Sequence, residues 1–329
     1  MRALSLIIFL TLIAEPGLYA QPCCGALAGG MGAAGARFGL GTAAPGNLQL
    51  QLAYDFNYMD RLHDGSARLE NNDLIRVIHT GILEVNYGVS RRLSLASMFT
   101  YSGQEIGSRR FDGSRQVDFL WGFGDMVLMA KYRLLNPLAY NGWEVAAGIG
   151  PKLPTGSYRL AGSEGEEFGM DIQPGSGSFD AISWLSVSKT HMFIPNLNLS
   201  SGVTYRYAGR NSNYLDGLLY DFGNEFQASA GLNYSFYAGV NFDVFGFIRY
   251  RHQGRDQLDG INVEMIGGRW LFASPGINMA LTQNLSVMML ADLPLHADLV
   301  GPQLTSSFRI SGGLVYTISP RRPVTLASR

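Results

Sequence analysis

Apolar and polar residues alternate along residues 47–58 (NLQLQLAYDFNY). Apolar side chains take every second position, namely Leu48, Leu50, Leu52, Tyr54, Phe56 and Tyr58, and between them lie Gln49, Gln51, Ala53, Asp55 and Asn57. A period of two predicts an extended strand with two unlike faces. In a water-soluble sandwich the polar face would contact solvent, whereas in an outer-membrane barrel the apolar face contacts lipid and the polar face contacts the lumen. One strand leaves both interpretations open.

The same alternation recurs along the chain and predicts twelve strands. They cover residues 47–58, 74–87, 93–101, 121–135, 143–152, 179–188, 196–207, 225–234, 244–251, 270–281, 285–293 and 307–318. Bacterial single-chain barrels have an even number of strands, with short turns at one end and long loops at the other. Tight connections such as GVSRR and TQN alternate here with long polar ones. We therefore predict an all-β fold, a transmembrane antiparallel up-and-down β-barrel of about 12 strands, whose closed sheet leaves no unpaired backbone in lipid.

The first residues of the chain predict export. Arg2 is followed by the apolar run LSLIIFLTLIA, and Ala20 is a small residue before the polar Gln21. This arrangement is typical of a secretory signal peptide over residues 1–20, cleaved after Ala20. The apolar run is too short to span a bilayer comfortably, so an uncleaved anchor is the weaker interpretation. Cys23 leaves a lipoprotein signal as an alternative.

Three further regions follow the predicted signal peptide. Residues 21–46 are rich in Gly and Ala and form either a flexible leader or a hatch inside the lumen. Residues 47–318 are predicted to form the barrel, and residues 319–329 a C-terminal tail. Adjacent Cys23 and Cys24 are expected to form a vicinal or intermolecular disulfide or to stay reduced, with capture of a soft metal as the alternative.

Composition narrows the class of protein further. Charged residues make up 16% of the chain, Gly numbers 41, and the formal net charge is -1. No segment after the signal peptide approaches twenty unbroken apolar residues, so helical membrane spans are not expected. The dispersed basic residues argue against a nucleic-acid surface. Together with export, this composition predicts a barrel in the bacterial outer membrane, with membrane lipids and lipopolysaccharide as its surroundings.

Aromatic residues gather at the ends of the predicted strands. One group would lie near the periplasmic rim: Tyr87, Tyr132, Trp143, Tyr234 and Tyr316. A second group would lie near the outer rim: Tyr58, Tyr101, Trp121 and Tyr207. Aromatic rings with a polar tip suit the lipid headgroup zone. Their positions therefore agree with two aromatic girdles.

Charged side chains on the predicted inward face are candidates for the lumen lining. They are Asp55, Arg76, Glu84, Asp125, Lys131, Arg133, Glu144, Lys152, Arg206, Arg249, Arg251, Asp292 and Arg309. Charges at this depth are tolerated only when paired or wetted. They form either a salt-bridged plug or the wall of a narrow aqueous path. We favour the path, because small inward residues leave room: Ser94, Gly148, Ser200, Gly231 and Gly313.

Short motifs in the middle of the chain resemble a known family. GFGDMVLMAKYRLL, GIGPKLPTGSY and QPGSGSFD, within about Asp118 to Ser188, are similar to segments of the family of the MetA-pathway of phenol degradation. The resemblance implies an outer-membrane transporter for small, aromatic or apolar molecules. The small-molecule substrate itself is not identified by the sequence.

An outer-membrane lipid-modifying enzyme is the first rival hypothesis. Such an enzyme could use a His-x-Ser pair on one strand face as base and nucleophile. The histidines are His63, His79, His191, His252 and His296, and none has a Ser two residues later. His79 lies on the predicted lipid-facing side of its strand. We therefore predict no catalytic residues, no metal site and no cofactor.

A structural or surface-interaction barrel is the second rival. Arg109, Arg110 and Arg115 in one predicted loop could contact lipopolysaccharide phosphates. The longest loop, residues 154–178, carries four acidic residues that could hold Ca²⁺, namely Glu164, Glu166, Glu167 and Asp171. We expect both sets to be solvated loop charges instead.

Overall fold

The computed structural model describes residues 42–320, except 72–73, 110–114, 137–141, 163–164, 166 and 216. The predicted signal peptide, most of the predicted leader, Cys23 and Cys24 lie outside the described residues, as do Arg110, Glu164 and Glu166. Within the described part, no helix has the length and apolar character of a membrane span.

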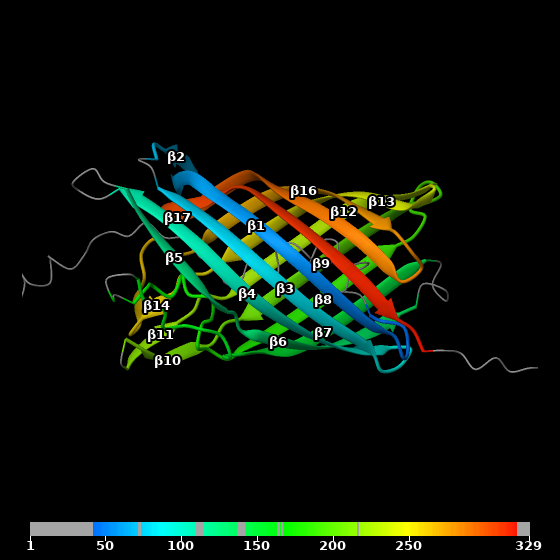
Figure 1. Cartoon of the computed structure of the whole chain (residues 1–329), viewed down its shortest axis with the longest axis horizontal. Coiled ribbons are helices and arrows are strands. Elements are labelled where there is room, and N and C mark those ends of the chain that lie inside the picture. Colours follow the sequence, from blue (N-terminus) through cyan, green and yellow to red (C-terminus); the bar gives the residue numbers. More distant parts are fainter. Residues whose placement is uncertain are drawn as a thin grey trace, which may run out of the picture.

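One large antiparallel sheet dominates the fold (Figure 1). Its strands are β1 (Leu48–Gly65), β2 (Ala67–Leu69), β3 (Ile75–Gly88), β4 (Leu93–Arg109), β5 (Arg115–Phe123), β6 (Met126–Leu135), β7 (Trp143–Leu153), β8 (Asp180–Lys189), β9 (Leu197–Tyr207), β12 (Glu225–Ala238), β13 (Val240–Gln253), β16 (Gly268–Ala280) and β17 (Leu285–Ile318). A second, small sheet contains β10 (Arg210–Tyr214), β11 (Leu218–Asp221), β14 (Gln257–Leu258) and β15 (Ile261–Asn262).

The large sheet closes on itself, because β17 pairs with β1 from Leu48↔Ile318 to Gly65↔Leu299. The first part of β17 pairs with β16 instead, up to Gly268↔Leu299. Nine antiparallel steps separate β1 from β16 around the wall, so these two strands run in opposite directions. The two halves of β17 must therefore also run in opposite directions. β17 turns back near Gly301, whose φ is 74°, and crosses the wall twice, so the chain makes the twelve crossings predicted from the sequence.

The two faces of the sheet differ as the barrel hypothesis requires. Leu52 and Tyr54 in β1 are 61% and 52% exposed, whereas Ala53 and Asp55 are 5% and 3% exposed. The other barrel strands repeat this pattern, with apolar side chains on the outer surface and polar ones mostly inside. A soluble sandwich would show the reverse. The prediction of a closed antiparallel barrel with an apolar outer face is confirmed.

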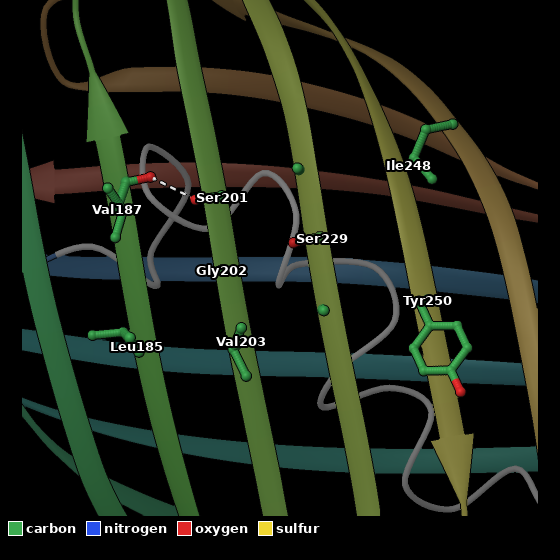
Figure 2. Close-up of a pocket in the computed structure, with 10 residues that line it drawn as sticks. Leu185, Val187, Ser201, Gly202, Val203, Ser229, Ile248 and Tyr250 are labelled. Carbon is green, nitrogen blue, oxygen red and sulfur yellow. Dashed lines mark hydrogen bonds between the residues drawn. The ribbon is translucent and has the colours of Figure 1, made fainter.

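A shallow groove lies on the outer face over β8, β9, β12 and β13 (Figure 2). Its volume is about 280 Å³. Small residues form its floor, including Ser201, Gly202 and Ala230, and bulkier side chains such as Leu185 and Ile248 flank it. Leu185 and Ile248 are exposed, so the groove opens away from the lumen and is no part of a path through the barrel.

Several predicted strand boundaries are wrong. The chain after Tyr101 was expected to be a polar loop, but β4 continues to Arg109 and pairs with β5, which begins at Arg115. Outside a lipid layer both faces of a strand can be wet, so backbone pairing continues there without the alternation that reveals it in the sequence. The predicted strand 121–135 is also divided between β5 and β6.

The two ends of the barrel are unlike (Figure 1). One end, which we call the loop end, carries β2, β5 and the small sheet. The other end, the termini end, contains the start of β1 and the end of β17, where Leu48 pairs with both Ile318 and Tyr87. Tight connections, such as the one between Gly88 and Leu93, lie at the termini end.

The seam between β1 and β17 predicts a specific disulfide. A Cβ on Gly313 would lie 3.0 Å from the Cβ of Ala53, so a shift of less than an ångström reaches the separation of roughly 3.8 Å that a disulfide needs. In a Cys23→Ser/Cys24→Ser background, Ala53→Cys combined with Gly313→Cys should cross-link on oxidation. The heated, denatured protein should then migrate faster in a non-reducing gel. Ala53→Cys combined with Gly312→Cys is the control, and cross-linking of both pairs to the same extent would contradict the register.

Candidate functional site: the barrel interior

All thirteen predicted lumen residues are buried or partly buried. Ten of them are buried and the other three, Arg133, Glu144 and Arg251, are partly buried. Each of the thirteen has an oppositely charged partner within 4.0 Å. The pairs are Asp55–Arg309, Arg76–Asp171, Glu84–Lys131, Asp125–Lys152, Arg133–Glu144, Arg206–Asp180, Arg249–Asp292 and Arg251–Glu225. The charges are therefore mutually neutralised, as in the salt-bridged account.

Six of the charges form a continuous chain near the loop end. We call Asp125, Lys152, Asp180, Arg206, Glu225 and Arg251 the charge chain. Successive contacts measure 2.6 Å for Lys152–Asp125, 3.2 Å for Lys152–Asp180 and 2.9 Å for Arg206–Asp180. The chain then continues through Arg206–Glu225 at 3.7 Å and Arg251–Glu225 at 3.3 Å. The charge chain crosses the inner surface from Asp125, just before β6, to Arg251 in β13. Its side-chain contacts connect neighbouring strands in addition to their backbone hydrogen bonds.

Asp180 and Glu225 were not among the predicted lumen residues. Each is the first residue of its strand, β8 or β12, where too few alternating neighbours precede it to fix its face. The register supplies the missing signal, because Asp180 pairs with Lys152 and Glu225 with Arg206.

A second group of charges lies beside the seam. Arg249 contacts Asp292 at 2.6 Å, and Arg309 contacts Asp55 at 2.6 Å. Asp55 also accepts a hydrogen bond from Ser311, and the Arg249 guanidinium lies 4.5 Å from the centre of the Phe272 ring. Such pairing offsets part of the desolvation cost of charges inside a barrel.

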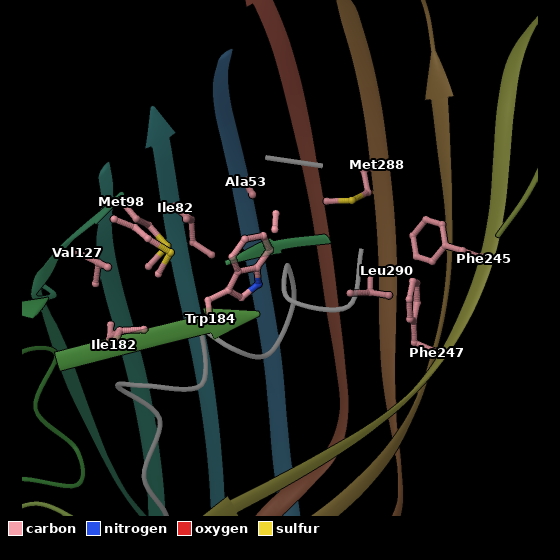
Figure 3. Close-up of a cluster of buried hydrophobic side chains, with 12 residues drawn as sticks. Ala53, Ile82, Met98, Val127, Ile182, Trp184, Phe245, Phe247, Met288 and Leu290 are labelled. Atoms are coloured by element: carbon pink, nitrogen blue, oxygen red, sulfur yellow. The ribbon is translucent and has the colours of Figure 1, made fainter. Parts of the chain in front are cut away.

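The interior also contains an apolar belt that the sequence analysis missed (Figure 3). It consists of Ala53, Ile82, Met98, Val127, Met129, Ala146, Ile182, Trp184, Phe245, Phe247, Met288 and Leu290, all buried. Trp184 projects into the interior among them. Several of these residues lie in runs that are apolar on both faces, such as 244–248 (VFGFI), where the period of two disappears. A continuous apolar run was the available signal that both faces are apolar.

The longest loop does not project from the barrel. Its last part, residues 167–178, enters the interior and is called the inner segment below. Residues 170–176 are all buried. Asp171, expected to be a solvated loop charge, is 5% exposed and contacts Arg76 on β3. That expectation was wrong, because the acidic residue is buried beside a cationic residue 95 positions earlier in the chain.

Glycines allow the two ends of this loop to pass each other. A Cβ on Gly175 would lie 2.7 Å from the Cα of Gly156, so neither position has space for a side chain. The Asp125 carboxylate also connects the two ends of the loop. It accepts one hydrogen bond from the Gly156 backbone N–H (3.0 Å) and one from the Ser176 backbone N–H (2.9 Å). The motifs GFGD, PTG and QPGSGS thus meet at one place.

His79, the histidine weighed as a catalytic base, lies on the outer face as expected. Its Nδ1 is 2.5 Å from the Tyr54 hydroxyl oxygen, and its ring stacks on Trp121 with centroids 6.1 Å apart. These contacts belong to an aromatic cluster on the outer wall and do not reach the interior.

The charge chain predicts a strong dependence of stability on Lys152. Lys152→Met would leave Asp125 buried without its cation, and breaking a buried pair in this way costs about 3–5 kcal/mol. We expect the free energy of unfolding, measured by urea titration of the refolded barrel, to fall accordingly. Arg210→Met is the control, because it removes an exposed cation paired with Asp221 and should change stability far less. Equal stability of the two variants would contradict the assigned role of Lys152.

Comparisons with known proteins agree with this architecture. Among solved structures, the chain resembles the COG4313 outer membrane channel from Pseudomonas putida F1, with a TM-score of 0.65, 16% identity, and coverage of 84% of this chain and 97% of that chain. The β-domain of the Bordetella autotransporter BrkA (TM-score 0.47, 12% identity, 82% and 99% coverage) and the toluene transporter TbuX from Ralstonia pickettii (TM-score 0.39, 9% identity, 93% and 96% coverage) are more distant. The likeness to the COG4313 channel, at 16% identity, bears on the fold alone.

No curated protein matches the sequence. A family model does match, over residues 37–293, which is most of the chain. Its description is "Putative MetA-pathway of phenol degradation", and this is the family whose motifs the sequence resembles. The chain belongs to this family.

Proposed function

We propose that the protein is a channel of the bacterial outer membrane through which small, largely apolar molecules pass without chemical change. The observation that carries this proposal is the apolar belt inside a barrel whose charges are paired. Free inward charges would favour the passage of ions, whereas paired charges present little net field. Aromatic and thioether side chains such as Trp184, Met98 and Met129 contact apolar molecules favourably.

The position of the belt supports the same function. It lies between polar groups at both ends, with the charge chain toward the loop end and the Glu84–Lys131 pair toward the termini end. A molecule that enters must leave water, contact the belt and then return to water or lipid. Binding that is weak and spread over several side chains permits such passage.

Outward aromatic residues support a membrane location and an orientation. Tyr87, Tyr132, Trp143, Tyr234 and Tyr316 are exposed, as are Tyr101, Trp121 and Tyr207. Rings in these positions suit two headgroup zones. In the proposed orientation the loop end faces the cell exterior and contacts lipopolysaccharide, and the termini end faces the periplasm.

Uptake by intact cells tests this function, because lipopolysaccharide retards apolar solutes that cross plain phospholipid freely. Cells that express the protein should take up 1-N-phenylnaphthylamine faster than cells with an empty vector. Trp184→Ala should change the uptake rate several-fold, because the indole occupies the interior. Leu185→Ala is the matched control, since the Leu185 side chain follows Trp184 in the sequence but is exposed on the outer face.

Equal uptake with and without the protein, in cells where the folded barrel is present, would contradict the channel. Equal effects of the two substitutions would contradict the role of the belt.

A further inference from the structure

The inner segment is attached to the barrel at two separate places. Near its end, the Asp125 carboxylate accepts hydrogen bonds from the Ser176 backbone, and Lys152 also donates to Ser178. Asn211 of β10 donates to the Ser176 carbonyl oxygen at 2.9 Å. Several backbone and side-chain contacts therefore fix this base.

The tip of the inner segment is attached to the wall through two residues. Arg76 of β3 donates to the Asp171 carbonyl oxygen at 3.0 Å, and Gln104 of β4 donates to the Ile172 carbonyl oxygen at 2.6 Å. Arg76 also donates to Gln104 at 2.8 Å, so the two anchors hold each other in place. We call this arrangement the tip latch.

One oxygen of the Asp171 carboxylate has no hydrogen-bond donor in the tip latch, within the part of the chain that the structure describes. This oxygen, Oδ2, lies 3.7 Å from an Arg76 nitrogen, beyond hydrogen-bond distance. A buried anion in this condition is costly, whereas a neutral carboxyl group at the same place is not. The charge of Asp171 therefore opposes the attachment that its backbone supports.

We propose that the inner segment is a gate whose tip latch holds while Asp171 is protonated and loosens as the pH rises. This inference rests on the proposed channel function. The base stays attached through Asp125, and the tip moves away from β3 and β4. The passage past the apolar belt then widens on the side of Arg76.

The direction of the pH effect follows from the burial of the carboxyl group. Burial is the largest influence and raises the pKa of Asp171 from 3.8 to about 6, although Arg76 opposes the shift. With the tip released into water, the pKa would return to its ordinary value. The latched state thus binds the proton more tightly, so acidification from pH 7 through 6 stabilises it and a rise in pH destabilises it.

The neighbours of Asp171 do not reverse this direction. Asp256, which follows β13, adds to the rise in the pKa of Asp171. Burial raises the pKa of Tyr214 on β10 and of Tyr220 on β11, so both phenols stay neutral over this pH range. Glu167 of the inner segment is exposed and faces Tyr214 as well. Arg76 keeps its charge throughout.

Uptake measured against pH tests the latch on the full-length protein. Between pH 5 and 7.5 the ratio of latched to open protein should fall about tenfold for a pKa that drops from about 6 to 3.8 on release. Uptake of the uncharged probe through the wild-type channel should therefore rise over this range. Asp171→Asn, which mimics the protonated group, should show low uptake at every pH, and Asp221→Asn at a partly exposed site should behave like the wild type.

Hydrogen exchange provides a second readout that needs no substitution. Protection factors of backbone amides in the inner segment should fall between pH 5 and 7.5, whereas those of β3 should not change. Uptake that does not vary with pH, or protection that stays constant, would overturn the latch while leaving the channel intact. Pronounced pH dependence that persists in folded Asp171→Asn would also overturn it. Absence of uptake at every pH would instead refute the channel function.

Discussion

Backbone N–H and C=O groups cannot remain unpaired in hydrocarbon, and this constraint governs the whole molecule. Only a sheet that closes on itself satisfies it with strands, and here β1 closes the sheet against β17 over nearly its entire length. Closure sets two unlike surfaces, one toward lipid and one toward the interior. Because every pairing in the wall is antiparallel, closure also requires an even number of crossings, which explains why β17 turns back near Gly301.

Closure leaves the paired charged residues inside, and their pairing determines what the interior can do. Neutralised pairs such as Arg249–Asp292 make a rigid polar wall rather than an ion path. The apolar belt occupies the space between the polar groups, and the inner segment enters from the loop end. Small inward residues in the sequence favour an open aqueous path, whereas the geometry favours paired charges around an apolar interior. The function proposed from the family resemblance and the function proposed from the interior therefore converge on apolar solutes.

The sequence predicts the strands and their faces well where alternation is sharp, as from Leu48 to Tyr58. It fails where chemistry on the two faces is alike. Phe245 and Phe247 point inward from a strand that is apolar on both sides, so no period distinguishes them. Long-range pairing is also invisible in the sequence: Arg76 and Asp171 are 95 positions apart, and only the inward course of the loop brings them together.

The central claim is that apolar side chains of the strands face lipid and the alternate ones face inward. Spin labels placed singly along β1, at Leu50, Gln51, Leu52, Ala53, Tyr54 and Asp55, test it most directly in lipid vesicles. Collision with dissolved oxygen should be high at Leu50, Leu52 and Tyr54 and low at Gln51, Ala53 and Asp55. An oxygen accessibility without a period of two, or with the opposite phase, would contradict the account.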